Sequence, residues 1–367
     1  MESLANDPRF SRCWTRIDLD TIAQNYENAR ALCRSQLIPV LKADAYGMGA
    51  VRVARVLMAR GAKLFAVATH AEAVELKNAL PCDVLVMGLV GEAELDEAMA
   101  RGVILAVFSL EYARAVSAHA KARPARVHFK VDTGLHRLGF SSLEELRAAA
   151  ALPGLAMEGL FSHLALRDRA GDEAQYARLM EAKALLHPPM THLVDSIGMV
   201  RYPDWRRDAV RCGAWLYGVC PARYDHPERC RPVAKFKARI AQIHFVPAGE
   251  RIGYDDDHCL ARDTRVATLT AGYSDGAPRL RHSGAVEIRG RRAGVLGLVC
   301  MDQMMADVTD VPDAQPGDEV TFFGGLISLD EYAAQGALNR NEALARLTRR
   351  VPRIYLQNGE AKAVGRF

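Results

Sequence analysis

Between residues 15 and 235, short apolar runs alternate with longer stretches in which apolar residues recur at helical spacing. The helical stretches include Ala50–Arg60, Ala71–Ala79, Ala93–Ala100, Leu110–Ala120, Leu143–Ala151 and Asp172–Leu186. Eight apolar runs are typical of buried strands: Leu37–Leu41, Leu64–Ala68, Val84–Met87, Val103–Val107, Val127–Val131, Gly159–Ser162, His192–Val194 and Val210–Cys212. Strands that alternate with helices indicate a parallel sheet with right-handed crossovers. Eight such units favour an α/β fold of the closed (β/α)8 TIM type, with an open doubly wound sheet as the alternative.

The pattern changes near Pro232, where strand-like runs follow one another between Gly, Pro and Asp turns. These runs are Phe236–Val246, Arg265–Leu269, Ala285–Arg289, Gly294–Cys300 and Glu319–Phe323. Two helices are expected, Leu329–Gln335 and Glu342–Arg349, with Ser328 and Asn341 as their N-caps. We therefore expect a barrel over residues 1–235, with residues 1–14 as an extension, and a C-terminal mostly-β domain over residues 236–367.

Composition and charge narrow the function classes. Half of the residues are hydrophobic and a quarter are charged, with a formal net charge of +4, which describes a globular protein and argues against disorder. No stretch approaches the roughly 18 apolar residues of a membrane span, and the start MESLANDPRF lacks the layout of a signal peptide, so we expect a cytoplasmic protein. The basic residues are scattered, which argues against nucleic acid as a partner.

The eight cysteines do not suggest a metal site. None forms a C-x-x-C pair, and the chain has no H-E-x-x-H or comparable ligand spacing. In a chain of 367 residues without a signal peptide, we expect reduced and mostly buried thiols.

Lys42 ends the first apolar run, in the stretch Val40-Leu41-Lys42-Ala43-Asp44-Ala45-Tyr46-Gly47. In one interpretation its amine extends to the rim of the barrel and stays solvated. In the other, partial desolvation lowers the pKa of the amine and makes it a nucleophile that forms a Schiff base with an aldehyde cofactor. Tyr46 follows four residues later, where its hydroxyl could donate a hydrogen bond to a phosphate; taken alone, a packing role is the other interpretation. The G-x-G of Gly47 and Gly49 lacks the rest of a dinucleotide fingerprint.

The stretch Val40–Gly49 resembles the pyridoxal-phosphate lysine motif of the alanine racemase family, the barrel-type (fold type III) enzymes. Further matches follow in the same order over nearly the whole chain: Trp14–Asp20, Lys130–Gly139, Val210–Gly218, Gly253–Tyr254, Gly272–Gly276, Cys300–Gln303 and Val351–Arg353. The resemblance implies a pyridoxal 5'-phosphate-dependent isomerase that racemises a small amino acid, with alanine first and D-alanine biosynthesis as a role.

The resemblance also implies which residues are catalytic. The cofactor makes the Cα proton acidic, and racemisation then needs an acid/base group on each face of a planar carbon. The family uses the cofactor lysine on one face, here Lys42, and a tyrosine on the other, here Tyr254. A tyrosine has a pKa near 10, so it needs a positive neighbour or a hydrogen-bond partner to act as a base. His163 and Arg211 match the family residues expected near it.

Further roles follow from the same resemblance. Arg211 matches the donor to the pyridine nitrogen, which favours racemisation over transamination because an arginine keeps its proton. The expected phosphate contacts are Tyr46, Ser196 and the backbone of Gly213 and Ala214. The expected substrate carboxylate contacts are Arg137 and the backbone of Met301, which Asp302 follows in the same block. Lys130 matches a lysine that is carbamylated in many members, although a plain surface charge stays an open interpretation. Tyr273 and Arg279 match residues at the entrance, or belong to an ordinary turn.

In the family, the tyrosine and the Cys-Met-Asp block reach the cofactor of the other subunit. The resemblance therefore implies a homodimer with two shared active sites, in which Tyr254 and Met301 serve the barrel of the partner.

Three positions depart from the family pattern. Met48 replaces the usual histidine, Asp195-Ser196 replaces Asn-Ser, and Arg349 stands where a tyrosine often narrows the pocket. The segments Ser196–Tyr202 and Asp208–Tyr217 also resemble the serine racemase domains of the vancomycin-resistance branch, so serine or a broad range of amino acids is an alternative substrate. A fold type III decarboxylase and a non-catalytic pyridoxal-phosphate-binding protein are the other functional hypotheses.

Overall fold

A computed structural model describes residues 12–364 except 122, 223–225 and 257. Contacts divide the chain into two compact units. The first, called the barrel unit here, comprises Ala23–Ala45 and Gly49–Arg231. The second, called the β unit, comprises the chain up to Ile22, the short segment Tyr46–Met48, and the chain from Pro232 onward.

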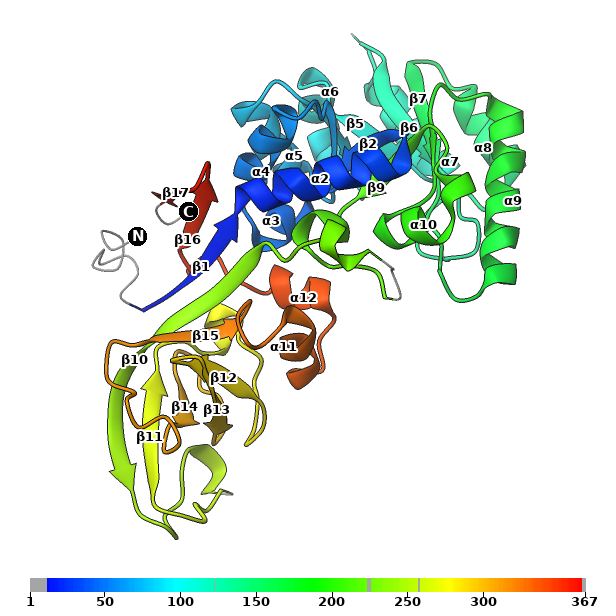
Figure 1. Cartoon of the computed structure of the whole chain (residues 1–367). Coiled ribbons are helices and arrows are strands. Elements are labelled where there is room, and N and C mark those ends of the chain that lie inside the picture. The colour runs from blue at the N-terminus through cyan, green and yellow to red at the C-terminus, as the bar shows by residue number, and fades with distance from the viewer. Residues whose placement is uncertain (1–11, 122, 223–225, 257, 365–367) are drawn as a thin grey trace. The chain divides into compact units, whose positions relative to one another are not determined.

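The barrel unit is built on eight parallel strands in the order β2-β9-β8-β7-β6-β5-β4-β3 (Figure 1). The bridge between Val40 and Ala66 joins the two outer strands, and the amide of Leu41 donates to the carbonyl of Ala66, so the sheet closes. The strands are β2 (Gln36–Pro39), β3 (Leu64–Val67), β4 (Asp83–Val86), β5 (Ile104–Val107), β6 (Ala125–Lys130), β7 (Leu155–Phe161), β8 (Thr191–His192) and β9 (Ala209–Cys212). Each of the eight predicted strands is present, which confirms the TIM-type barrel and excludes the open sheet.

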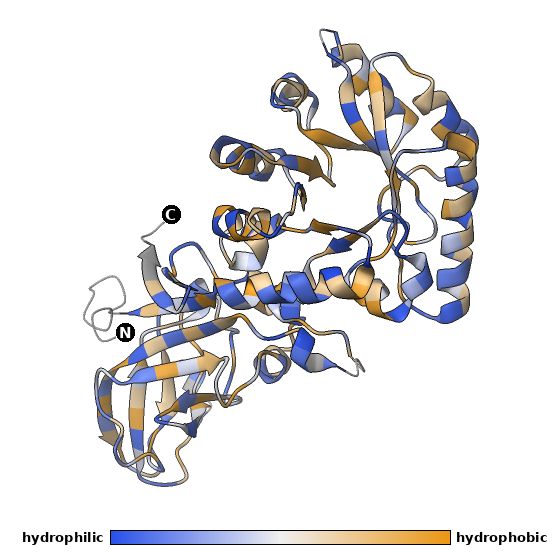
Figure 2. Cartoon of the chain, turned by 45° about the horizontal axis from the view of Figure 1, so that its top comes forward, coloured by the Kyte–Doolittle hydropathy of each residue, from blue (hydrophilic) through white to orange (hydrophobic). Residues whose placement is uncertain are grey.

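The helices of this part of the chain follow the predicted pattern. They are α2 (Leu19–Cys33), α3 (Lys42–Gly47), α4 (Ala50–Met58), α5 (His70–Ala79), α6 (Leu95–Ala100), α7 (Leu110–His119), α8 (Leu143–Ala150), α9 (Arg169–Leu186) and α10 (Ser196–Arg201). The barrel strands are almost continuously apolar because helices cover them, and Figure 2 shows hydrophobic strands beside helices of mixed character. The barrel core includes the fully buried rings of Phe65, Phe129 and Phe161.

The β unit holds a nine-stranded sheet in the order β11-β14-β13-β12-β15-β10-β1-β16-β17. The long strand β10 pairs antiparallel with both β15 and β11, so six of the strands close into an antiparallel β-barrel. The strands are β1 (Cys13–Asp18), β10 (Ala234–Val246), β11 (Thr264–Leu269), β12 (Ala285–Ile288), β13 (Arg291–Leu296), β14 (Met304–Asp307), β15 (Glu319–Phe323), β16 (Arg353–Gln357) and β17 (Glu360–Val364). The mostly-β C-terminal domain is thereby confirmed.

The N-terminal strand differs from the expectation for the barrel boundaries. Strand β1 pairs antiparallel with β10 and parallel with β16, more than 200 and 300 residues away in sequence, so it belongs to the β unit. After the short segment Tyr46–Met48, the chain enters the β unit for the third time at Pro232. Strands β14, β16 and β17 were also not predicted, because their apolar runs are short.

The two short helices of the β unit are α11 (Leu329–Gln335) and α12 (Arg340–Ala345). Ser328 caps α11 as predicted, because its hydroxyl accepts from the amide of Glu331 at 3.1 Å. The N-cap assigned to Asn341 was wrong. Asn339 caps α12 through its side-chain oxygen, which accepts from the amide of Asn341 at 2.8 Å, and the helix begins at Arg340.

Two features of the described residues bear on function. Within the described ranges, no helix is long and apolar enough to cross a membrane, and no group of three or more His, Cys, Asp or Glu side chains is arranged to hold a metal ion. The eight cysteines are free thiols, and five of them are buried. Burial raises the pKa of Cys33 to about 12, so this thiol stays protonated.

Candidate active site

Lys42 opens α3, a single turn with left-handed backbone. Ala43, Asp44, Ala45 and Tyr46 all have φ between 54° and 57°, a region that costs L-residues roughly 1–2 kcal/mol each. The surroundings hold this turn in place. The amide of Ala43 donates to the Glu72 carboxylate at 2.6 Å, and the Asp44 carboxylate accepts from the amide of Ala50 at 2.7 Å. These hydrogen bonds fix the backbone conformation of the residues that follow Lys42. The apolar pattern did not predict this left-handed turn.

The Lys42 amine lies in a positively charged environment. Desolvation, followed by the nearby charges of Arg137 and Arg211, lowers its pKa, while Asp195 and Glu72 act in the opposite direction. Lys42 as a whole residue is exposed three positions after β2 ends, although its amine is partly desolvated. A lowered pKa is what a Schiff-base lysine needs, which favours the activated-amine interpretation.

Arg211, the third residue of β9, is 3% exposed and is held by acceptors on two neighbouring segments, one at the end of β7 and one at the end of β8. Its Nη2 donates to the carbonyls of Ser162 at 2.6 Å and Leu193 at 2.7 Å, and lies 3.1 Å from Nδ1 of His163. Burial lowers its pKa to about 10, so the guanidinium stays charged at neutral pH. Among the described residues, Nε of Arg211 has no hydrogen-bond acceptor, and this donor is left for a ligand.

A pair of buried histidines behind Arg211 was not predicted. Nδ1 of His192 lies 2.6 Å from Nη1 of Arg211, and Nε2 of His192 lies 2.9 Å from Nδ1 of His128. An arginine can only donate, so His192 accepts at Nδ1 and donates from Nε2 to His128. Burial lowers the pKa of His128 to about 4 and that of His192 well below its usual value, so both rings are neutral. The sequence offered one signal for this pair, namely a histidine within each of two apolar runs that were predicted as strands.

Lys130 is buried, so the interpretation as a surface charge was wrong. The last residue of β6, it is 6% exposed, and its Nζ lies 5.5 Å from the ring centre of Phe161. Desolvation, followed by the charges of Arg137 and Arg211, lowers its pKa to about 8. The amine is therefore readily deprotonated. Arg137 itself lies in the loop after β6 and is exposed.

His163 follows the end of β7 and is neutral. Burial, and then the charges of Arg211 and Arg137, lower its pKa to about 3. His163 therefore does not contribute a positive charge near the site, and of the two residues expected near Tyr254 only Arg211 is cationic.

A set of polar groups suited to a phosphate lies where β8 and β9 end. The Ser196 hydroxyl accepts from the amides of Gly213 and Trp215, both at 3.2 Å, and Ala214 begins the short 3-10 helix Ala214–Tyr217 between them. The neighbouring Asp195 accepts from the amides of Ile197 and Gly198, both at 2.9 Å, so its carboxylate caps α10.

Two other departures from the family pattern lie in the β unit. Met48 is fully buried, so an apolar side chain at that position contributes to packing. Arg349 is exposed. Tyr46 occupies the last left-handed position before Gly47 in α3 and is half-buried.

Tyr254 lies at the tip of a hairpin in the β unit. The hairpin is closed by the amide of Gly249 donating to Leu260 and that of Ile252 donating to His258. Tyr254 is 62% exposed there, and Asp255 beside it pairs with Arg281 at 2.5 Å. Tyr254 belongs to the β unit, whereas Lys42, Lys130 and Arg211 belong to the barrel unit.

The remaining predicted residues of the β unit lie together. Met301, which is 53% exposed, and Asp302 occupy the loop before β14, and the amide of Tyr273 donates to the carbonyl of Cys300 at 3.1 Å. The Arg279 guanidinium lies 5.8 Å from the ring centre of Tyr273. The structure thus brings Tyr273, Arg279, Met301 and Asp302 into one surface.

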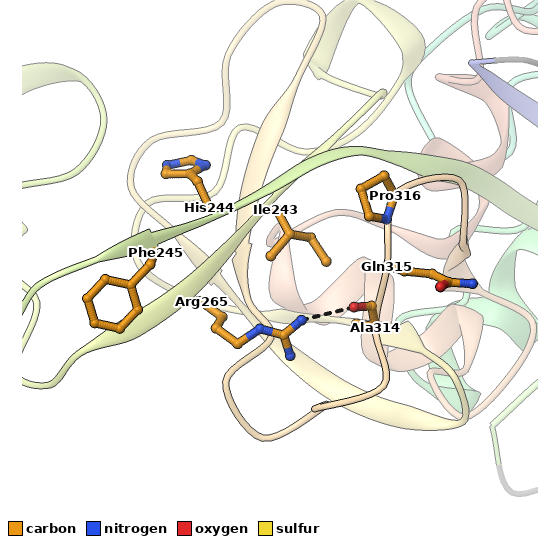
Figure 3. A pocket seen from close by; sticks show the side chains of 7 residues that line it. All are labelled: Ile243, His244, Phe245, Arg265, Ala314, Gln315 and Pro316. Carbon is orange, nitrogen blue, oxygen red and sulfur yellow. Dashed lines mark hydrogen bonds between the residues drawn. The ribbon is translucent and has the colours of Figure 1, made fainter.

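The β unit also has a cavity of about 440 Å³ beside β10 (Figure 3). It is lined by Ile243, His244, Phe245, Arg265, Ala314, Gln315 and Pro316, none of which is a predicted site residue. Arg265 donates to the carbonyl of Ala314 at 3.0 Å, as the dashed line in Figure 3 marks. This cavity is not part of the candidate site.

Comparison with family models matches both parts of the chain. The model described as alanine racemase, N-terminal domain, matches residues 17–221, and the model described as alanine racemase, C-terminal domain, matches residues 233–355. The chain is 33% identical over 366 residues to an alanine racemase of Methanococcus maripaludis, covering 94% of this chain and 98% of the relative. It is 38% identical over 332 residues to an alanine racemase of Syntrophobacter fumaroxidans, covering 86% and 88%.

Solved structures are similar over the same extent. An alanine racemase of Clostridium difficile superposes with a TM-score of 0.88 at 30% identity, covering 96% of this chain and 97% of the other. An alanine racemase of Bartonella henselae with covalently bound pyridoxal phosphate gives a TM-score of 0.88 at 28% identity, covering 94% and 99%. An alanine racemase of Bacillus anthracis with bound L-Ala-P gives a TM-score of 0.89 at 26% identity, covering 97% and 98%.

Proposed function

The chain belongs to the alanine racemase family, and on this premise we propose that it interconverts L- and D-alanine with pyridoxal phosphate as its cofactor. The observation that carries the proposal is the group of basic residues in the barrel unit, where Lys42 with its lowered pKa lies near the buried Arg211. The vancomycin-resistance branch is not indicated by the relatives compared above. Serine therefore remains only as a competing substrate.

The residues of the barrel unit fit the cofactor chemically. The Lys42 amine suits an aldehyde, and Nε of Arg211 suits a pyridine nitrogen. Because the Ser196 hydroxyl accepts from the Gly213 amide, its own proton and the backbone at Ala214 suit a phosphate. Pyridoxal phosphate, when bound, delocalises the electron pair that remains after Cα loses its proton. Because Arg211 keeps its own proton, a ring nitrogen beside it stays unprotonated. This favours return of the proton to Cα, which gives racemisation, over transamination.

Proton transfer on the two faces is assigned to Lys42 and Tyr254. Lys42 holds or releases a proton at Nζ on one face, and its lowered pKa brings that exchange closer to neutral pH. The Tyr254 hydroxyl does so on the opposite face. A tyrosine that is 62% exposed on a hairpin tip is available to another surface, which supports a homodimer in which Tyr254 of the partner subunit completes the site.

Lys130 is proposed to carry a carbamate that orients Arg137. Its pKa of about 8 provides the neutral amine that attacks carbon dioxide, and the reaction forms a C–N bond and releases one proton. The resulting negative charge would lie among the positive charges of Arg137, Arg211 and Lys42, which the electrostatics favour. Arg137, held in this way, and the Met301 amide of the partner subunit bind the substrate carboxylate.

The test of this function is a coupled D-amino-acid oxidase assay on L-alanine and L-serine. We expect D-alanine formation with a higher kcat/KM than D-serine formation, and an absorbance band from the lysine-bound cofactor. Lys42→Ala should lose the band and at least about 10⁴-fold in activity. Lys63→Ala is the matched control, because Lys63 is an exposed lysine that immediately precedes the barrel strand β3.

Three results would contradict the proposal. A higher kcat/KM for serine than for alanine would identify serine as the preferred substrate. Release of carbon dioxide from lysine or ornithine would identify a decarboxylase. A bound cofactor with neither reaction would identify a non-catalytic binding protein.

The role of Tyr254 has a separate test. Tyr254→Phe removes only the hydroxyl, so racemisation should fall by about 10²–10⁴-fold while the absorbance band and the unfolding temperature stay. Unchanged racemisation in both directions would rule out the two-base mechanism.

A further inference from the structure

The loop that carries Met301 packs against the turn Gly272–Gly276 through backbone contacts. The Met301 carbonyl accepts from the Ser274 amide at 3.0 Å and from the Ser274 hydroxyl at 2.7 Å. The preceding carbonyl, that of Cys300, accepts from the amide of Tyr273 at 3.1 Å. A Cβ atom added at Gly272 would lie 2.4 Å from both carbonyl oxygens, so the two backbones touch.

These contacts determine where the amides of the loop point. A trans peptide is planar, and its N–H points opposite to its carbonyl. Because the carbonyls of Cys300 and Met301 both face the turn, the N–H groups of Met301 and Asp302 face away from it. Among the described residues, neither N–H has a hydrogen-bond acceptor. Two successive unpaired amides on an exposed loop form a donor pair for an anion such as a carboxylate.

The charges around Ser274 decide where its single hydroxyl proton goes. Besides the Met301 carbonyl, the hydroxyl lies 3.2 Å from Oδ1 of Asp302, which is a competing acceptor. Nη2 of Arg350 donates to the same Oδ1 at 2.5 Å and offsets its charge. The Ser274 proton is thereby left to the Met301 carbonyl.

Arg350 and Arg12 are in turn held by one buried carboxylate. Asp275 is fully buried and accepts from Arg12 at 2.6 and 2.7 Å and from Nε of Arg350 at 2.9 Å. Arg12 also donates to the carbonyl of Asp302 at 2.9 Å. The donor pair is therefore supported by a connected set of hydrogen bonds and does not depend on the loop alone.

We propose that Ser274 is a positioning residue for the substrate carboxylate: it holds the Met301 carbonyl so that the amides of Met301 and Asp302 are aimed together at that carboxylate. This inference rests on the proposed racemase function and deepens it, because it names the group that orients the carboxylate donors. Ser274 itself touches neither substrate nor cofactor in this role.

The test compares Ser274→Ala, Ser274→Thr and the control Ser283→Ala, an exposed serine in the same unit. For each, KM and kcat for alanine, the inhibition constant of propionate and the unfolding temperature are measured on the cofactor-loaded enzyme. Ser274→Ala should raise KM and the propionate constant about threefold to tenfold, with kcat within about twofold. Ser274→Thr, which keeps the hydroxyl, and Ser283→Ala should match the wild type.

A second pair of variants tests the charge argument. Arg350→Gln should raise both constants because Asp302 then competes for the Ser274 proton, and adding Asp302→Asn should lower them again. Unchanged constants in Ser274→Ala, or the same rise in Ser274→Thr, would overturn the role of the hydroxyl in an enzyme that racemises alanine. A wild type that does not racemise alanine would instead overturn the proposed function, and this inference with it.

Discussion

The barrel unit and the β unit hold their site residues in opposite ways. In the barrel unit, Arg211 and Lys130 are 3% and 6% exposed, and desolvation lowers the pKa of both. In the β unit, Tyr254 and Met301 are 62% and 53% exposed and are presented by a hairpin tip and a loop. Burial in the barrel core changes the acidity of these two side chains by desolvation, whereas a hairpin tip or a loop leaves a hydroxyl or an amide exposed. The barrel unit thus shifts the pKa values of its site residues by burial, and the β unit keeps its site residues exposed.

The largest expected effect concerns the buried guanidinium. Arg211→Met leaves the carbonyls of Ser162 and Leu193 and the Nδ1 atom of His192 without their donor, and buried acceptors without partners are costly. We expect a loss of about 3–5 kcal/mol in the free energy of unfolding, measured by urea denaturation. Arg262→Ala, an exposed arginine of the β unit that pairs with Asp307 and Asp310, should leave the unfolding midpoint nearly unchanged. Equal losses would contradict the contrast between the units.

The second prediction concerns the pH dependence of stability. Lys130 has a native pKa of about 8 against its ordinary 10.5, so between these values the unfolded chain binds more protons than the native one. Stability attributable to Lys130 should therefore rise with pH across that window, by about 3 kcal/mol, and stay flat below pH 8. In CO2-free buffer, Lys130→Met should lack this rise, and Lys63→Met should keep it. A rise that persists in Lys130→Met would place its origin elsewhere.

The third prediction tests the backbone contact in the β unit. Gly272→Ala puts a Cβ atom 2.4 Å from the carbonyls of Cys300 and Met301, so the loop must move. We expect a loss of about 1–3 kcal/mol in the free energy of unfolding and a higher KM for alanine, with the barrel-bound cofactor band unchanged. Gly294→Ala is the matched control, because a Cβ there meets nothing within 4 Å. A Gly272→Ala variant with wild-type KM would show that the loop tolerates displacement.

The smallest expected effect distinguishes the two asparagines at the start of α12. Asn339→Ala removes the observed cap and should lower the free energy of unfolding by about 1 kcal/mol. Asn341→Ala should change it by less than about 0.5 kcal/mol. Thermal unfolding of both variants measures the difference, and the reverse ranking would support the cap first assigned from the sequence.

The sequence alone determined the eight barrel strands, the change to β structure near Pro232 and the position of Lys42 at the end of the first run. These are local features, because a covered parallel strand is apolar throughout and a turn carries its own residues. The family motifs located Tyr254 and Met301 in the same way, as short segments read along the chain.

Only the tertiary structure decided what these segments meet. Strand β1 joins the β unit because its partners lie in β10 and β16, and His128 finds His192 across 64 residues of sequence. The buried state of Lys130, the left-handed turn after Lys42 and the carbonyls held by Ser274 depend on contacts of the same kind. Contacts between residues far apart in sequence produce no periodic pattern along the chain. They nevertheless determine the pKa of a side chain and the local backbone conformation, because both depend on the groups that the fold places around a residue.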